Sequence, residues 1–138
     1  PGAGDKLAPR LFSEIGEDRG QYPEVQSLQC VAGTAPVSFQ SGQIPQARIR
    51  WHCNRHLRHA VHLWSDCSRK VCAWAQAYSL AQREKGKSHA CALRCLGQRW
   101  LKILWKMWQT RQPYDEARHA LNQQRHGSWR LQLHPKKT

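Results

Sequence analysis

The sequence predicts a small all-α domain, a helical bundle with an N-terminal turn and one long loop. Apolar residues recur at intervals of three and four over long stretches, the alternation typical of strands is weak, and the connections are short. Seven Trp among 138 residues supply large side chains to bury, although the net charge is +13. One hydrophobic core built by four or more helices is therefore expected.

Three elements are expected before residue 48. A helix over residues 5–15 begins where Asp5 can cap its free amides, and Pro9 removes one of its early hydrogen bonds. A second, short helix covers residues 23–31. Residues 34–47 show no helical period and include two prolines and a glycine, which predicts the long loop.

Four helical segments are expected after the loop, each with apolar side chains on one face. They cover residues 49–64, 67–85, 88–112 and 114–124. The expected buried stripes of the first three are Cys53, Leu57, Ala60, Val61 and Trp64; Cys67, Val71, Trp74, Tyr78 and Ala81; and Leu93, Leu96, Trp100, Ile103, Leu104 and Met107. Ser88 is expected to cap the third segment. We assign residues 1–124 to the helical domain and residues 125–138 to a flexible basic tail.

Positive charge is concentrated after residue 24. Residues 1–24 carry three Lys or Arg against five Asp or Glu, whereas residues 25–138 carry 19 against four. This surplus favours a polyanionic partner, because each Lys or Arg that meets a phosphate releases counterions; a solvated surface is the alternative. No membrane-spanning stretch and no secretory leader are visible, so membrane association and secretion are disfavoured and a cytoplasmic protein is expected.

Cysteine and histidine offer two metal hypotheses. Cys67 with Cys72 and Cys91 with Cys95 would supply four thiolates, but without the two-residue gap of common zinc knuckles, so free thiols in a reducing compartment are favoured. Histidines stand at positions 52, 56, 59 and 62 of one expected helix. No carboxylate accompanies them at that spacing, which favours surface or phosphate-contacting roles. No metal site is predicted in this chain.

A serine nucleophile is the remaining chemical candidate. After residue 24 the carboxylates are only Asp66, Glu84, Asp115 and Glu116, in three separate segments, so a metal nuclease centre is not predicted. Ser41, followed by Gly42, lies in the expected loop, and an activated serine can attack phosphate. On these two residues alone, an ordinary loop is the favoured interpretation.

A series of short motifs covers nearly the whole chain. In order they are Pro1-Gly2-Ala3-Gly4, Glu14-Ile15-Gly16, Ala32-Gly33-Thr34-Ala35-Pro36, Ser41-Gly42, Asn54 with Leu57-Arg58, Trp74-Ala75 with Tyr78, Gly86 with His89, Ala92-Leu93-Arg94, Trp100-Leu101, and Tyr114-Asp115. Together they resemble the C-terminal domain of insertion-sequence transposases of the IS110 (IS116/IS902) family. One departure is Cys53, where many relatives have Gly; it indicates a subgroup or an earlier helix start.

The resemblance implies a role for this chain within a longer bacterial protein. An N-terminal acidic domain that binds Mg²⁺ is expected to precede it, which agrees with a chain that begins at Pro1 and has Met107 as its only Met. By position, Ser41 corresponds to the family's nucleophile, which attacks a DNA phosphodiester to give a transient phosphoserine link; Ser38 is the nearest alternative. DNA is the implied partner, with a guide RNA and a homo-oligomer as further expectations for the full-length protein.

The expected nucleic-acid contacts fall in three places. They are Arg48, Arg50, Arg55 and Arg58 beside the serine loop, Arg99, Lys102 and Lys106 along one helix face, and the backbone amides of Gly2 and Gly4, whose turn resembles that of helix-hairpin-helix modules. Our leading hypothesis is a serine-bearing transposase domain that is inactive without its missing half. The rivals are a non-catalytic basic module that binds nucleic acid or protein and a zinc-stabilised structural domain.

Overall fold

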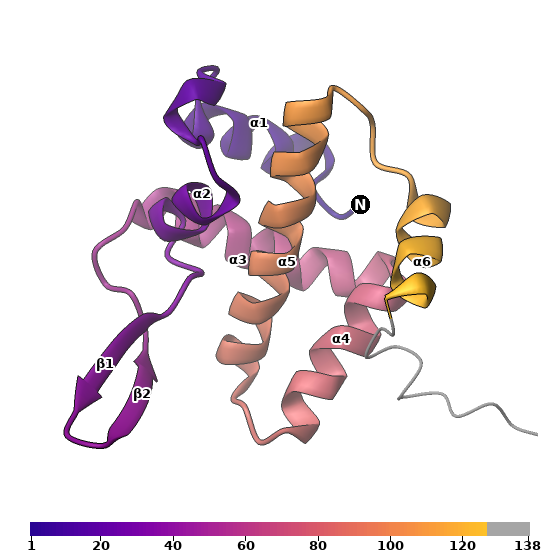
Figure 1. The fold of residues 1–138 in the computed structure, drawn as a ribbon. Helices are drawn as coiled ribbons and strands as arrows, with labels where there is room; N and C mark the ends of the chain where they lie inside the picture. Colours follow the sequence, from indigo (N-terminus) through magenta and orange to yellow (C-terminus); the bar gives the residue numbers. More distant parts are fainter. Residues whose placement is uncertain (127–138) are drawn as a thin grey trace, which may run out of the picture.

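The computed structural model describes residues 1–126 of the chain. Within this range six α-helices and one two-stranded hairpin occur, so the predicted helical architecture is confirmed (Figure 1). In chain order the elements are α1 (Gly4–Ile15), a 3₁₀ turn (Arg19–Gln21), α2 (Val25–Val31), β1 (Val37–Ser41), β2 (Ile44–Arg48), α3 (Arg55–Val71), α4 (Ala73–Glu84), α5 (His89–Thr110) and α6 (Glu116–Arg125). Most of the expected tail, residues 127–138, lies outside the described part.

The expected long loop is a β-hairpin, which corrects the sequence prediction. Strands β1 and β2 pair antiparallel from Val37 with Arg48 to Ser41 with Ile44, and Gly42 and Gln43 form a two-residue turn. The φ of Gly42 is +66°, and a positive φ at the first turn position alone is the pattern of a type II′ turn. The period-two signal was weak because residues 37–40 of β1 and all of β2 are exposed, so these residues bury no apolar face.

The main differences from the predicted helix boundaries concern α1 and α3. Asp5 lies inside the first turn of α1 and does not cap it, because the cap position is Ala3. Helix α3 begins at Arg55, not at residue 49, because the Asn54 side chain accepts a hydrogen bond from the Leu57 amide and sets the start there. The same helix continues through Val71, so Cys67 and Val71 belong to α3, and the segment predicted from residue 67 begins only at Ala73 as α4. Val71 is 68% exposed rather than part of the core.

The core is built around three tryptophans of α3, α4 and α5. The ring centroid of Trp100 lies 5.2 Å from that of Trp64 and 4.7 Å from that of Trp74. Each indole N–H has an acceptor: Trp64 donates to the Pro1 carbonyl, Trp74 to the Tyr114 hydroxyl and Trp100 to Ser68 Oγ. Most of the predicted stripe residues on these helices are buried, which confirms the helical periodicity.

The helices form one body from which the hairpin projects (Figure 1). Helix α3 packs against α1, α4 and α5, and α5 also packs against α2 and α4. The capping role of Ser88 is confirmed, since its Oγ accepts from the Cys91 amide at the start of α5. Among the described residues, no helix has both the length and the apolar character that crossing a membrane requires.

Candidate nucleic-acid interface

The hairpin places Ser41 at the far end of a strand. Ser41 is the last residue of β1, next to the turn, and it pairs with Ile44. Its neighbours Gln40 and Gly42 are exposed, as is every residue of β2. Positions along a strand alternate between its two faces, so Ser38, three residues earlier, occupies a position of opposite parity. The two candidate serines therefore occupy different register positions, since Ser38 pairs with Ala47 and Ser41 with Ile44.

Arg48 and Arg50 stabilise the hairpin near its base. The Arg48 guanidinium carbon lies 4.6 Å from the centroid of the Phe39 ring on the paired strand, a cation–π contact. Arg50 donates from Nε to the Ala35 carbonyl at 3.2 Å, just before β1. Both side chains belong to the region predicted to contact phosphate, and Arg48 is exposed. Arg50 also has a structural role, because it links the two ends of the hairpin segment.

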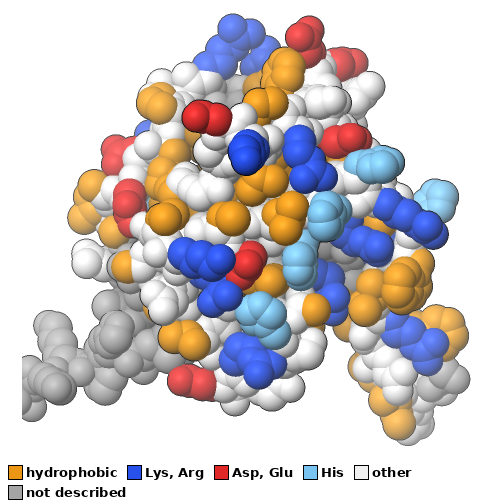
Figure 2. All heavy atoms as spheres, turned by 180° about the vertical axis from the view of Figure 1, so that it is seen from behind, with side chains coloured by type: hydrophobic (Ala, Val, Ile, Leu, Met, Phe, Trp, Pro, Cys, Tyr) orange, Lys and Arg blue, Asp and Glu red, His pale blue; other side chains and the backbone are white. Residues whose placement is uncertain are grey.

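A groove of about 300 Å³ lies at the base of the hairpin, against the first half of α3. Its ionisable lining side chains are Arg55, Arg58, His59, His62 and Arg94. No carboxylate is among the described residues that line it, so the groove is electropositive. Figure 2 shows this gathering of Arg and His side chains on the side of the molecule from which the hairpin projects. The structure thus brings the predicted Arg55 and Arg58 together in one site.

Trp51 and Arg94 complete this groove, and the sequence analysis missed both. Trp51 is 71% exposed, and the Arg58 guanidinium carbon lies 5.6 Å from the centroid of its ring. The available signal was Trp51 between basic residues, outside every apolar stripe. Arg94 lines the groove from α5, and spacing in the sequence does not reveal this long-range contact between α5 and the α3 region.

The electrostatics of the groove act most clearly on His62. Burial lowers the pKa of His62, and the nearby His59, His89 and Arg94 lower it further, while Asp66 opposes the shift. The imidazole is therefore mostly neutral at pH 7. An anion in the groove would favour its protonated form.

Of the four histidines predicted on one helix, only His56, His59 and His62 belong to α3. His52 lies before the cap residue of that helix. Among the described residues, no three Cys, His, Asp or Glu side chains come together as a metal-holding group, and the six cysteines are free thiols. Neither metal hypothesis gains a site in this part of the chain.

The other predicted cations lie along a second groove, between α5 and α6. Arg99, Lys102 and Lys106 line this hollow of about 1230 Å³, joined by Arg118 of α6. Arg99 also stacks over the Tyr78 ring, with 5.1 Å between the guanidinium carbon and the ring centroid. Asp115 is a lining residue too, so this groove is less uniformly positive than the one at the hairpin.

The N-terminal turn has a clear packing role. A Cβ placed on Gly2 would lie 2.6 Å from both the Cα and the amide nitrogen of Ser68, and the φ of Gly2 is +79°. Gly2 is therefore required for the close approach of the first residues to α3. Gly4 is exposed. A phosphate role for the amides of Gly2 and Gly4 stays a prediction.

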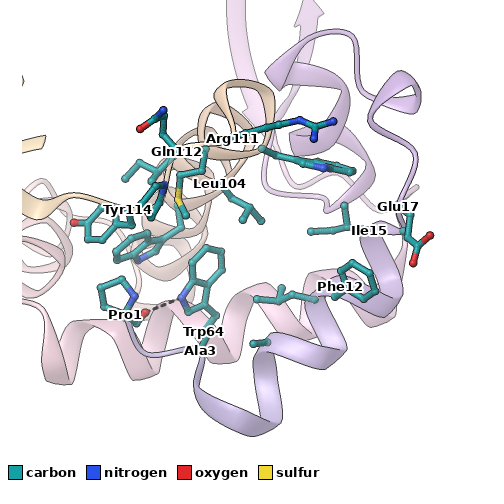
Figure 3. A pocket seen from close by; sticks show the side chains of 18 residues that line it. Pro1, Ala3, Phe12, Ile15, Glu17, Trp64, Leu104, Arg111, Gln112 and Tyr114 are labelled. Atoms are coloured by element: carbon teal, nitrogen blue, oxygen red, sulfur yellow. Dashed lines mark hydrogen bonds between the residues drawn. The ribbon is translucent and has the colours of Figure 1, made fainter. Parts of the chain in front are cut away.

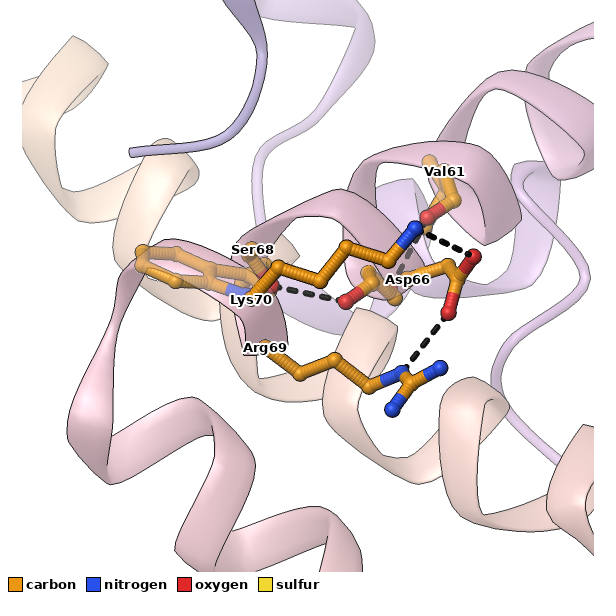
Figure 4. A network of polar contacts seen from close by, with 7 residues as sticks. Val61, Asp66, Ser68, Arg69 and Lys70 are labelled. Carbon is orange, nitrogen blue, oxygen red and sulfur yellow. Dashed lines mark hydrogen bonds and ion pairs between the residues drawn. The ribbon is translucent and has the colours of Figure 1, made fainter.

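Asp66 belongs to a local polar network on α3 (Figure 4). Its carboxylate accepts from Arg69 Nε at 2.7 Å and lies 3.8 Å from Lys70 Nζ. The Arg69 hydrogen bond is the main reason that the pKa of Asp66 is lowered. On the buried side, Ser68 Oγ donates to the Ser65 carbonyl and accepts from Trp100. This network joins α3 to the core.

An apolar hollow of about 830 Å³ opens between α1 and the C-terminal half of α5 (Figure 3). Phe12 and Ile15 line it from α1, Trp64 from α3, and Leu104 and Trp108 from α5. Its walls carry few charges, so its chemistry differs from that of the two basic grooves.

Comparisons with known proteins identify the family. The family model described as Transposase IS116/IS110/IS902 family matches residues 1–80. The chain is 36% identical over 118 residues to a Streptomyces coelicolor protein named as a candidate transposase of the IS117 mini-circle, covering 86% of this chain and 28% of that protein. It is 32% identical over 119 residues to an uncharacterized 42 kDa protein of insertion element IS900 from Mycobacterium paratuberculosis, covering 85% and 30%.

A third relative is an uncharacterized 43.6 kDa protein of insertion element IS110 from Streptomyces coelicolor, 30% identical over 108 residues. This match covers 78% of the chain and 26% of that protein. The chain thus spans less than a third of the length of the relatives that it matches. The family match covers more than half of the chain, from its first residue into α4. The chain belongs to the IS116/IS110/IS902 family of transposases.

Proposed function

We propose that this chain is the serine-bearing, DNA-binding part of a transposase, and that Ser41 is its nucleophile. The observation that carries the proposal is the position of Ser41 at the end of a projecting hairpin whose base adjoins a groove lined by Arg55, Arg58 and Arg94. Cations at the base of the hairpin can hold the DNA backbone, and Ser41 belongs to the turn end of the same hairpin. Family membership supports the same assignment.

The proposed step is a transesterification. The Ser41 oxygen attacks a phosphodiester phosphorus, a serine–phosphate bond forms, and one phosphorus–oxygen bond of the DNA breaks. The serine proton passes to a base, and the displaced deoxyribose oxygen takes up a proton. The number of phosphodiester bonds does not change, because one phosphodiester replaces another. Cationic side chains that position the phosphate stabilise the charge that develops on it.

Mg²⁺ is the expected cofactor of the full-length protein, and its carboxylate ligands are expected outside this chain. The described residues bring together no three ligating side chains, and Asp66 is held by Arg69. When bound in the complete enzyme, the ion would stabilise phosphate charge. The residues of this chain would supply the nucleophile and the grip on the DNA backbone.

The test joins this chain to an acidic domain of the family and offers it target DNA with its guide RNA. The wild type is expected to give a covalent protein–DNA adduct, seen as a shifted band that survives denaturation. Ser41→Ala should abolish the adduct, while Ser38→Ala, the matched control on the same strand, should retain it. An undiminished adduct in Ser41→Ala would remove Ser41 from the mechanism.

A second candidate function is a non-catalytic module that binds nucleic acid. The two basic grooves favour it, because they provide phosphate contacts without requiring chemistry at Ser41. This candidate predicts tight, salt-dependent DNA binding with no adduct under any of the conditions above. Loss of the adduct in Ser41→Ala alone would exclude it.

A further inference from the structure

Trp51 has the surroundings of a binding residue rather than a core residue. It is 71% exposed, and it stands just after β2 and before the cap of α3. Among the described residues, no hydrogen bond of its indole is found, in contrast to the indoles of the core. One face contact is present, from the Arg58 guanidinium at 5.6 Å. A large aromatic surface is thus left available at the mouth of the groove.

The groove beside Trp51 combines an aromatic side chain with cationic side chains from two helices. Arg55 and Arg58 come from the first turn of α3, and Arg94 comes from α5. Ile49, Val61 and Leu93 add apolar surface. The hollow measures about 300 Å³, which is at the lower end of small-molecule pockets. This size suits one flat heterocycle with its attached phosphate better than the side of a double helix.

We propose that this groove takes one unstacked nucleotide of a nucleic-acid strand, with its base stacked on Trp51 and its phosphate held by Arg55, Arg58 or Arg94. The inference rests on the proposed function only in taking nucleic acid as the partner. Every base has an aromatic face, so stacking requires no particular sequence, and Arg guanidinium groups add cation–π and phosphate contacts. A base inside a duplex cannot reach an indole in this way, so the groove selects an unpaired or extruded nucleotide.

The test measures binding of the chain to a fluorescent oligothymidylate and to a duplex of equal length, at one fixed salt concentration. Trp51→Ala should lower the affinity for the single strand about tenfold, with a smaller change, below about threefold, for the duplex. Trp51→Phe should retain most of the single-strand affinity because it keeps an aromatic face. Phe12→Ala, which removes an exposed aromatic side chain on α1, is the matched control and should bind like the wild type.

Two binding results would overturn the inference. One is unchanged single-strand binding by Trp51→Ala; the other is an equal loss for single strand and duplex. Circular dichroism checks that the Trp51→Ala variant is folded. So that the test does not depend on the variant alone, the wild type is also irradiated with an oligonucleotide containing 5-iodouracil. Peptide mapping should place the crosslink on Trp51, and crosslinks only at other residues would contradict the proposal.

The same experiment separates this inference from the proposed function. Ser41→Ala should bind the oligothymidylate normally even though it forms no adduct. If the wild type binds both nucleic acids and only the Trp51 results fail, the nucleotide groove is wrong and the proposed function stands. If the wild type binds neither, both are overturned.

Discussion

The core tryptophans and Trp51 at the hairpin base differ in burial and in hydrogen bonding. Trp64, Trp74 and Trp100 are nearly buried, lie ring against ring, and donate each indole N–H to an acceptor in the chain. Trp51 is mostly exposed, and the Arg58 guanidinium lies over the face of its ring. The first group satisfies its polar atoms internally, as buried groups must. The difference separates buried tryptophans with internal acceptors from an exposed one beside cations, at the place where we propose that a nucleotide binds.

The two regions also differ in charge. The core network around Ser68 is neutral, and the nearby Asp66 is matched by Arg69 and Lys70. At the hairpin base, cations gather without a carboxylate among the described lining residues. Such a cluster repels itself and gains stability when an anion arrives. Stability and binding should therefore respond to different substitutions.

The largest expected effect separates the two groups of tryptophans directly. Trp100→Ala should reduce the free energy of unfolding by about 3–5 kcal/mol, because it empties the centre of the core and leaves Ser68 without its donor. Trp51→Ala should change it by less than about 0.5 kcal/mol. Urea denaturation followed by circular dichroism measures both. Equal losses would break the comparison.

The second effect concerns how the N-terminus joins the core. Gly2→Ala should destabilise the chain by about 1–3 kcal/mol, because its Cβ would overlap the Ser68 backbone and its φ of +79° is strained for Ala. Gly42→Ala, the control in the hairpin turn, also has a positive φ but meets no atom within 4 Å. It should cost about 1 kcal/mol. A larger loss for Gly42→Ala in urea denaturation would show that the hairpin belongs to the cooperative core.

A third prediction tests the point where the two regions meet. Asn54 caps α3 and also donates from Nδ2 to Glu14 of α1 at 3.0 Å. Asn54→Ala should lower the free energy of unfolding by about 1 kcal/mol and weaken oligonucleotide binding slightly, because Arg55 and Arg58 lie in the first turn. Denaturation and fluorescence anisotropy report the two effects. Wild-type values in both assays would contradict the assigned cap.

The smallest effect depends on pH. The pKa of His62 is lower in the folded chain than its ordinary 6.5, so unfolding takes up a proton as the pH falls below that value. Stability should therefore decrease as the pH falls from 6.5 through the lowered pKa, whereas affinity for a phosphate strand should increase. His62→Gln should weaken both trends. Parallel trends, rising or falling together, would contradict the assignment of His62 to a phosphate groove.

The sequence predicted the helical body better than the hairpin for a physical reason. The body is amphipathic, so stripes such as Leu93, Leu96 and Trp100 mark its core. The hairpin buries almost nothing, and register and turn geometry define it instead. The cap at Asn54 follows the known preference of Asn for this position. The prediction nevertheless started the helix six residues too early, because it took the apolar Ile49 as the first residue of the stripe.

The candidate site was predicted only in part, because it is assembled across the chain. The adjacent Arg55 and Arg58 could be identified from local charge, and the resemblance pointed to Ser41. The addition of Arg94 from α5 depends on helix packing, and the exposure of Trp51 depends on the position of the hairpin. Neither property can be obtained from spacing along the sequence.

The most direct test of the division between body and binding face is the salt dependence of oligothymidylate affinity. We compare the wild type with a variant in which Arg55, Arg58 and Arg94 are all replaced by Gln. The slope of log affinity against log salt concentration should become less steep by about 0.7 for each phosphate contact removed, with the urea midpoint almost unchanged. An identical slope in the two proteins would place the nucleic-acid contacts elsewhere and contradict the account.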